Sequence, residues 1–318
     1  MAEPRYGEER KQMGSIVGDR PKISVIMGVY NGADRVDEAI ASIRVQTFTD
    51  WEFIICDDAS TDNTWEKLVE WSKIDSRIVP IRNEKNMKLA ATLNKCLEHA
   101  SGSYIARMDD DDYSYPWRLM AQNDFLDVNT YYAFVSGQVN GLTKEFGIIE
   151  DYWHRKEFPE KKDFLKGSQF IHPATMFRKG PLMKAGGYRI APETRRMEDY
   201  DLFMRLYAMG YIGCNLQRPM LRYTVDFDKT TYAHRIDEVK VRYQGFKALG
   251  LLPWGFIYVI RPLIVGLIPH DTLMEIKLED NGVDLRKYRR RHRRKKEMIW
   301  LEIVILNYFL HFAGKEVL

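Results

Sequence analysis

The sequence predicts an α/β fold in which helices flank a mostly parallel central sheet. Three observations predict it: apolar runs alternate with segments of helical period over the first 140 residues, the first run is apolar except for Ser24, and three runs end in polar, aspartate- or asparagine-containing loops. Such alternation is typical of βαβ units, whose strands are parallel and covered on both faces. The sequence therefore predicts a sheet with functional residues in the loops at the carboxyl ends of its strands.

The elements follow in order. The first strand is expected at residues 23–29 (ISVIMGV), before a turn at YNGA and a helix in which Val36, Ile40 and Ile43 share one face. Further strands are expected at 52–56, 78–82 and 104–108, with helices near 63–72 and 87–99 between them. Beyond about residue 140 the alternation fades into extended segments at 141–154 and 172–178, followed by a helix at EDYDLFMRLYAMG.

Composition limits the class of protein. The 318 residues are 45% hydrophobic, and 48 Lys and Arg oppose 45 Asp and Glu, so the chain can bury a core and is nearly neutral. Its three cysteines, Cys56, Cys96 and Cys214, fit neither a disulfide framework nor a zinc site and indicate a cytoplasmic protein. Residues 1–20 are expected to form a flexible polar arm without a signal peptide.

An acidic run, MDDDD, ends the fourth expected strand. Asp109, Asp111 and Asp112 on a tight loop place oxygens where a hard divalent cation can be chelated. The alternative is a solvated acidic turn that caps the next helix. Neither G-x-G-x-x-G after the first strand nor a P-loop motif is present, so a phosphate must be held in another way, and a metal ion at MDDDD would supply it.

A second acidic loop, CDDASTDNT, follows the second expected strand. Its carboxylates can accept hydrogen bonds from a pyrimidine N–H or from ribose hydroxyls, whereas Ser60, Thr61 or Asp62 can also cap the following helix.

Five motifs in order resemble the family-2 glycosyltransferases with a GT-A fold, and among them the bacterial enzymes of exopolysaccharide and capsule synthesis. The resemblance covers roughly residues 21–225 and rests on PKISVIMGVYNGA, SIRVQTFTDWEFIICDDASTDNT, NMKLAATLNKCLEHASGSYIARMDDDDYSYPWRL, HPATMFR and TRRMEDYDLFMRL. It implies a GT-A domain at 21–245, Rossmann-like in its sheet.

The resemblance also implies site residues for the nucleotide. The loop after the first strand and the DD pair hold the base and ribose in this family, which here places Gly28, Tyr30, Asp58 and the adjacent Asp57 at the nucleoside.

For the diphosphate, the family's D-x-D element matches Asp109 and Asp111, which would bind Mn²⁺ or Mg²⁺, with Asp111 in direct contact. Many relatives complete the metal shell with a His where this chain has Asp226.

The ED pair at the start of the EDYDL helix matches Glu198 and Asp199, and the family's catalytic base is the aspartate. His172 in HPATMFR matches a position that lines the site, although a structural role is an equal alternative and the nearby His234 could serve instead.

The implied reaction is an inverting transfer of a sugar from a nucleoside-diphosphate sugar, most commonly a UDP-sugar, to a hydroxyl of a polyprenyl-diphosphate-linked glycan. The alternative is a catalytically silent protein that keeps the fold and acts by binding a protein partner.

The C-terminal region, residues 246–318, is expected to be helical and to associate with an anionic membrane surface. The apolar run 251–269 contains Arg261 and Pro262 near its centre, which favours an interfacial or re-entrant helix over a span. Nine Lys or Arg lie within 286–296, before the apolar segment 298–312. Nucleic-acid binding and a solvated helix face are alternatives for the basic block; a membrane is favoured over nucleic acid because apolar segments flank it on both sides. The expected location is cytoplasmic, peripheral on the inner face of the cell membrane.

Overall fold

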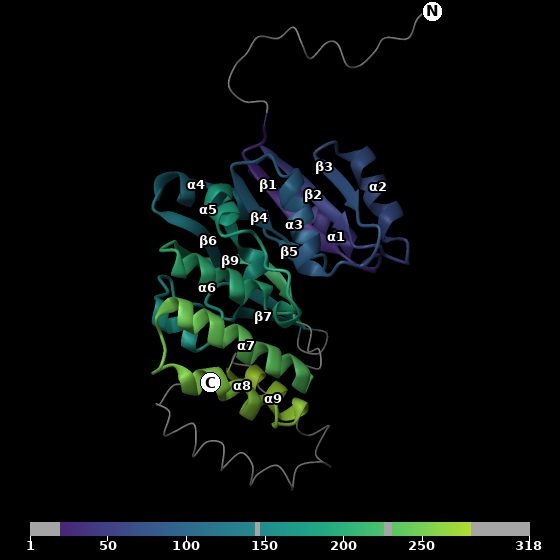
Figure 1. The fold of residues 1–318 in the computed structure, drawn as a ribbon. Helices are drawn as coiled ribbons and strands as arrows, with labels where there is room; N and C mark the ends of the chain where they lie inside the picture. The colour runs from purple at the N-terminus through teal and green to yellow at the C-terminus, as the bar shows by residue number, and fades with distance from the viewer. Residues whose placement is uncertain (1–19, 144–146, 226–230, 281–318) are drawn as a thin grey trace, which may run out of the picture.

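The computed structural model describes residues 20–143, 147–225 and 231–280. The expected polar arm before residue 20, Asp226, the basic block 286–296 and the segment 298–312 lie outside these residues. Figure 1 shows the arrangement, with β1 to β4 at one end of the molecule and α7 to α9 at the other.

The first half of the described chain alternates strands and helices as predicted. Its elements are β1 (Ile23–Val29), α1 (Val36–Arg44), β2 (Trp51–Asp57), α2 (Thr64–Ile74), β3 (Ile78–Arg82), α3 (Leu89–His99), β4 (Tyr104–Arg107), β5 (Tyr113–Ser114) and α4 (Arg118–Val128). The second half comprises β6 (Tyr132–Thr143), β7 (Gly147–Tyr152), β8 (Met176–Arg178), α5 (Lys179–Lys184), α6 (Glu198–Ala208), β9 (Ile212–Thr224), α7 (Tyr232–Leu249), α8 (Phe256–Val265) and α9 (His270–Asp280), with short 3-10 turns at Lys161–Leu165, His172–Ala174 and Pro192–Thr194.

One sheet runs through the domain in the order β3-β2-β1-β4-β8-β6-β9-β5, with β7 paired to β6. The prediction of a mostly parallel sheet is correct for β1 to β4 and wrong for the whole: of eight pairings between described strands, four are parallel and four antiparallel. The chain between β4 and its neighbour β8 contains β5, α4, β6 and β7, so the two strands are not joined as one βαβ unit and can run antiparallel.

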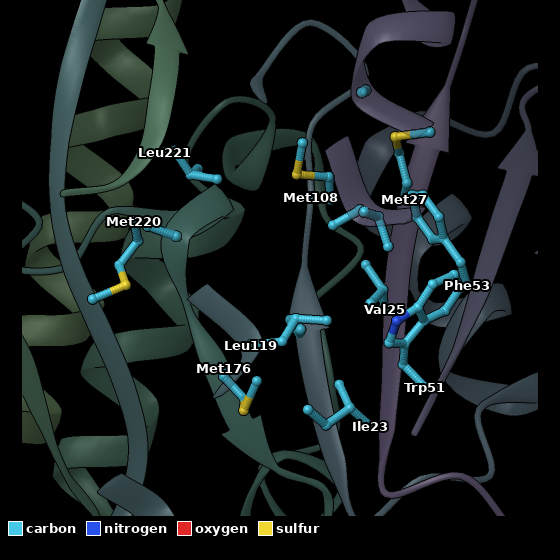
Figure 2. Close-up of a cluster of buried hydrophobic side chains, with 14 of the residues drawn as sticks. Ile23, Val25, Met27, Trp51, Phe53, Met108, Leu119, Met176, Met220 and Leu221 are labelled. Atoms are coloured by element: carbon cyan, nitrogen blue, oxygen red, sulfur yellow. The ribbon is translucent and has the colours of Figure 1, made fainter. Parts of the chain in front are cut away.

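Two clusters of apolar side chains cover the two faces of the sheet. Successive side chains of a strand point to opposite faces, so Ile23, Val25 and Met27 of β1 pack in one cluster while Ile26 packs in the other. Figure 2 shows part of the first cluster, where Met108, Leu119 and Met220 come from three other parts of the chain. The first cluster includes residues of α1, α2 and α4, and the second includes residues of α3, α6 and α7.

The C-terminal helices extend the domain beyond α6. α7 packs between α6 and α8, and the expected boundary at 245/246 falls inside α7. Pro262 lies within α8 and does not end it. Among the described residues, no helix has both the length and the apolar character that crossing a membrane requires.

Candidate functional site

The loops that follow β1, β2, β3 and β4 meet at the carboxyl edge of the parallel strands. Short backbone hydrogen bonds join them: the Asp58 N–H donates to the Val29 carbonyl at 2.8 Å, and the Asn83 N–H donates to the Asp57 carbonyl at 2.8 Å. The Met108 N–H donates to the Ile26 carbonyl at 3.0 Å. The sequence prediction that several polar loops share one edge is therefore correct.

The loop after β1 contacts both acidic loops. The Asn31 N–H donates to Ser60 Oγ at 2.9 Å, which ties this loop to the one after β2. Gly32 lies against the acidic run: a Cβ built there would be 2.5 Å from Asp110 Oδ2. Tyr30, expected at the nucleoside, is 44% exposed at this edge. Gly28, by contrast, faces α3, where a Cβ would meet Thr92 Cγ2 at 3.0 Å.

Asp58 is bound by its own protein. Its Oδ1 accepts hydrogen bonds from Asn83 Nδ2 at 2.8 Å and the Met87 N–H at 2.7 Å, and its Oδ2 accepts one from the Lys88 N–H at 2.9 Å. Asp57 Oδ2 pairs with Arg82 Nε at 2.8 Å. An ionised carboxylate has about four acceptor sites, so Asp58 keeps room for about one further donor while it holds the loop between β3 and α3.

The acidic run after β4 is arranged differently. One carboxylate oxygen from each of Asp109, Asp111 and Asp112 lies within 4.8 Å of the others. Asp112 Oδ1 accepts the Thr224 N–H at 2.8 Å, but its Oδ2 is buried without a hydrogen-bond partner. Asp110 is turned away and pairs with Arg35 Nη2 at 2.8 Å.

Burial and mutual repulsion raise the pKa values of this run. Burial raises the pKa of Asp111 to about 7, and the charges of Asp109 and Asp110 act in the same direction. Burial likewise raises the pKa of Asp110 to about 6 and that of Asp112 well above its usual range. Crowded carboxylate oxygens, one of them without a hydrogen-bond partner, are the ligands that a hard divalent cation prefers. These residues therefore fit Mn²⁺ or Mg²⁺.

The ED pair starts α6. Glu198 is 8% exposed and Asp199 is partly buried. Burial raises the pKa of Glu198 to about 7, assisted by the charge of Asp199, and burial also raises the pKa of Asp199. Asp109 adds to both shifts, and the guanidinium of Arg107 opposes both. The ED pair and the acidic run thus belong to one electrostatic group.

His172 is buried beside this group. Its Nε2 lies 2.8 Å from the Tyr188 hydroxyl, and the two rings meet edge to face. Burial and the charge of Arg107 lower the pKa of His172 well below its usual range, so the ring is neutral at pH 7.

Several arginines of the site were not predicted from the sequence. Arg107, the last residue of β4, is 2% exposed, pairs with Asp109 and has no hydrogen-bond partner for its Nε. Its position in the apolar strand YIAR, directly before the acidic run, was the available signal. Arg35, Arg118 and Arg155 also act on these carboxylates. The site thus combines six carboxylates, those of residues 109–112, 198 and 199, with four guanidinium groups.

Comparison with known proteins identifies the family of the chain. A model of glycosyl transferase family 2 matches residues 24–186. A Bacillus subtilis (strain 168) protein that carries the name glycosyltransferase EpsE is 39% identical over 253 residues, which is 78% of this chain and 90% of that protein. The Escherichia coli enzyme UDP-Glc:alpha-D-GlcNAc-diphosphoundecaprenol beta-1,3-glucosyltransferase WfaP is 37% identical over 250 residues, 78% of this chain and 95% of the enzyme.

Solved structures share the fold. The chain resembles S. aureus TarS 1-349 in complex with UDP-GlcNAc with a TM-score of 0.60 and 18% identity, over 84% of this chain and 77% of that one. It resembles the mannosyltransferase PcManGT from Pyrobaculum calidifontis, in complex with GDP-Man and Mn²⁺, with a TM-score of 0.53 and 20% identity, over 85% of this chain and 82% of that one. The domain therefore has a GT-A-like architecture.

Proposed function

The chain belongs to glycosyl transferase family 2, and on that premise we propose that it transfers a sugar, with inversion, from a UDP-sugar to a hydroxyl of a lipid-linked saccharide in bacterial exopolysaccharide or capsule synthesis. Two E. coli relatives support the substrates: their names specify UDP-Glc or UDP-Gal as donor and GlcNAc-diphosphoundecaprenol as acceptor. Family membership favours a transferase over the alternative of a silent protein that only binds a partner.

The observation that carries the proposal is the group of oxygens from Asp109, Asp111 and Asp112, with one buried Asp112 oxygen lacking a partner. We assign these residues to a Mn²⁺ or Mg²⁺ ion, with Asp226 as a further ligand outside the described residues. When bound, such an ion offsets the charge that develops on the leaving diphosphate. Tyr30 and the remaining acceptor site of Asp58 would contact the nucleoside.

Asp199 is the proposed catalytic base. It takes the proton of the acceptor hydroxyl while the acceptor oxygen forms a bond to the anomeric carbon and the bond to the diphosphate oxygen breaks. Its raised pKa, which burial causes, makes the ionised carboxylate a stronger base. Glu198, the preceding residue, and neutral His172 would shape the pocket for the sugar.

Replacing the base tests this assignment. Asp199→Asn is expected to retain UDP-sugar binding and to lower the transfer rate about 10²–10⁴-fold, the usual contribution of a general base. The measurement is transfer from UDP-sugars to a synthetic lipid-linked GlcNAc diphosphate, with calorimetry for binding. Asp124→Asn, an exposed position on α4, is the matched control. Transfer by Asp199→Asn at the control's rate would show that another group is the base.

The location of the reaction is part of the proposal. A polyprenyl-linked acceptor is held in a membrane, so the enzyme must work at its surface. We assign residues 246–318 to docking on the cytoplasmic face, through the basic block and apolar segments that flank it.

A further inference from the structure

The outward side of α8 is apolar. Val259 and Pro262 are buried toward the protein, whereas Ile257, Ile260 and Ile264 are 53%, 36% and 44% exposed. Residues three and four apart lie on the same side of a helix, so these three isoleucines form one face. Trp254 and Leu267, 92% and 74% exposed, extend it at both ends, and we call these five residues the α8 face.

The charge of α8 lies at the edge of this face, because Arg261 is four residues from Ile257 and three from Ile264. Arg261 is the helix's one charged residue, and its Nη1 donates to the Lys166 carbonyl at 3.4 Å. Partial burial lowers the pKa of Arg261. A surface helix of a protein surrounded by water usually carries several charged or polar residues on its outer face, whereas the outer face of α8 carries isoleucines with a single arginine at its edge. The arrangement of α8 therefore points to a non-aqueous neighbour.

The apolar surface continues onto α7. Between the two helices lies a groove of about 290 Å³, whose lining includes Val239, Tyr243, Phe256 and Ile260. Ile236 of α7 is 43% exposed. In Figure 1 these helices lie at the end of the molecule remote from β1 to β3. Contiguous exposed apolar surface of this kind marks an interaction site.

We propose that the α8 face inserts into the interfacial layer of an anionic lipid bilayer. A helix of 10 residues is about 15 Å long and cannot span a hydrocarbon core of about 30 Å, so it would lie in the membrane plane. Tryptophan favours this depth, and Trp254 is the most exposed large apolar side chain of the described residues.

Charge identifies the lipid as anionic. Residues 250–269 contain no Asp or Glu. The basic block begins at Arg286, six residues after α9 ends at Asp280, and extended chain of that length reaches at most about 20 Å. The nine Lys and Arg of this block would meet lipid phosphates. This inference refines the proposed membrane docking by assigning it to a folded helix in addition to the basic block.

The test removes the apolar face and keeps every charge. In the full chain, Ile257→Ser/Ile260→Ser/Ile264→Ser is compared with Ile74→Ser/Val128→Ser/Ile190→Ser, three exposed residues on other surfaces (62%, 79% and 66% exposed). Co-sedimentation with phosphatidylcholine vesicles containing phosphatidylglycerol should show a partition coefficient lowered about tenfold or more in the first variant and unchanged in the control. Metal-dependent hydrolysis of UDP-sugar in solution should be equal in both, so that loss of docking is distinguished from loss of catalysis.

Three outcomes would overturn the inference. Wild-type protein that does not bind the vesicles would show that no docking occurs. Equal partition of the two variants would leave the basic block as the sole anchor. A wild-type dimer that the α8 variant converts to a monomer, with vesicle binding unchanged, would show that the face binds a second copy of the chain.

Discussion

Two runs of aspartate follow β2 and β4, the two strands that flank β1, and their surroundings are opposite. Asp58, after β2, accepts hydrogen bonds from three donors of the chain segment 83–88. Asp111 and Asp112, after β4, lie among other carboxylates, and one Asp112 oxygen has no partner. Hydrogen bonds from the protein satisfy most of the acceptor sites of Asp58, whereas the second run needs a cation to neutralise its carboxylates. A carboxylate's surroundings, more than its place in a motif, decide whether it serves the fold or the chemistry.

The largest effect on stability is expected at Asp58. Asp58→Asn would remove charge-assisted hydrogen bonds to the Met87 and Lys88 N–H groups, each worth about 1.5–3 kcal/mol, so the free energy of unfolding should fall by about 3 kcal/mol or more. Urea denaturation measures it, and Mn²⁺ should not restore the loss. Asp50→Asn, at an exposed position, is the control. A loss no greater than the control's would mean that Asp58 is free to serve the nucleotide alone.

The opposite behaviour is expected at Asp111. Because burial and neighbouring carboxylates raise its pKa to about 7, the neutral Asp111→Asn should leave the metal-free protein as stable as wild type or more so. Wild type should gain about 2.7 kcal/mol at a Mn²⁺ concentration 100 times the dissociation constant, and the variant should lose most of this gain. Thermal unfolding with and without Mn²⁺ measures both. Equal stabilisation of the two proteins by Mn²⁺ would place the ion elsewhere.

The two runs also show how far the sequence leads. The strands β1 and β3 have the predicted ends, because short runs rich in apolar and β-branched residues and bounded by turns define them locally. The donors that separate Asp58 from Asp111 are not local: Asn83 and Met87 lie 25 and 29 residues from Asp58. Arg107 was missed for two reasons. The alternation of a strand predicts only the face on which a residue lies, and arginine side chains are rarely fully buried. The antiparallel half of the sheet was missed because its pairings join segments far apart in the chain.

Asp75, outside both runs, is a second example of a structural carboxylate, with a smaller expected effect on stability. Hydrogen bonds from the Arg77 guanidinium lower the pKa of Asp75 to about 2. Because this is below the unfolded value of about 3.9, ionised Asp75 stabilises the fold above about pH 4, and this stabilisation is lost as the pH falls toward 2. Asp75→Asn should therefore lower the free energy of unfolding by about 1–2 kcal/mol at pH 7 and by progressively less below pH 4. Urea denaturation across pH 3–7 measures this, and the difference between variant and wild type should be the same with and without Mn²⁺. If the difference in the free energy of unfolding stayed constant with pH, the Arg77 pair would not set the charge of Asp75. A complete set of hydrogen-bond donors would then not be what separates a structural aspartate from a metal-binding one.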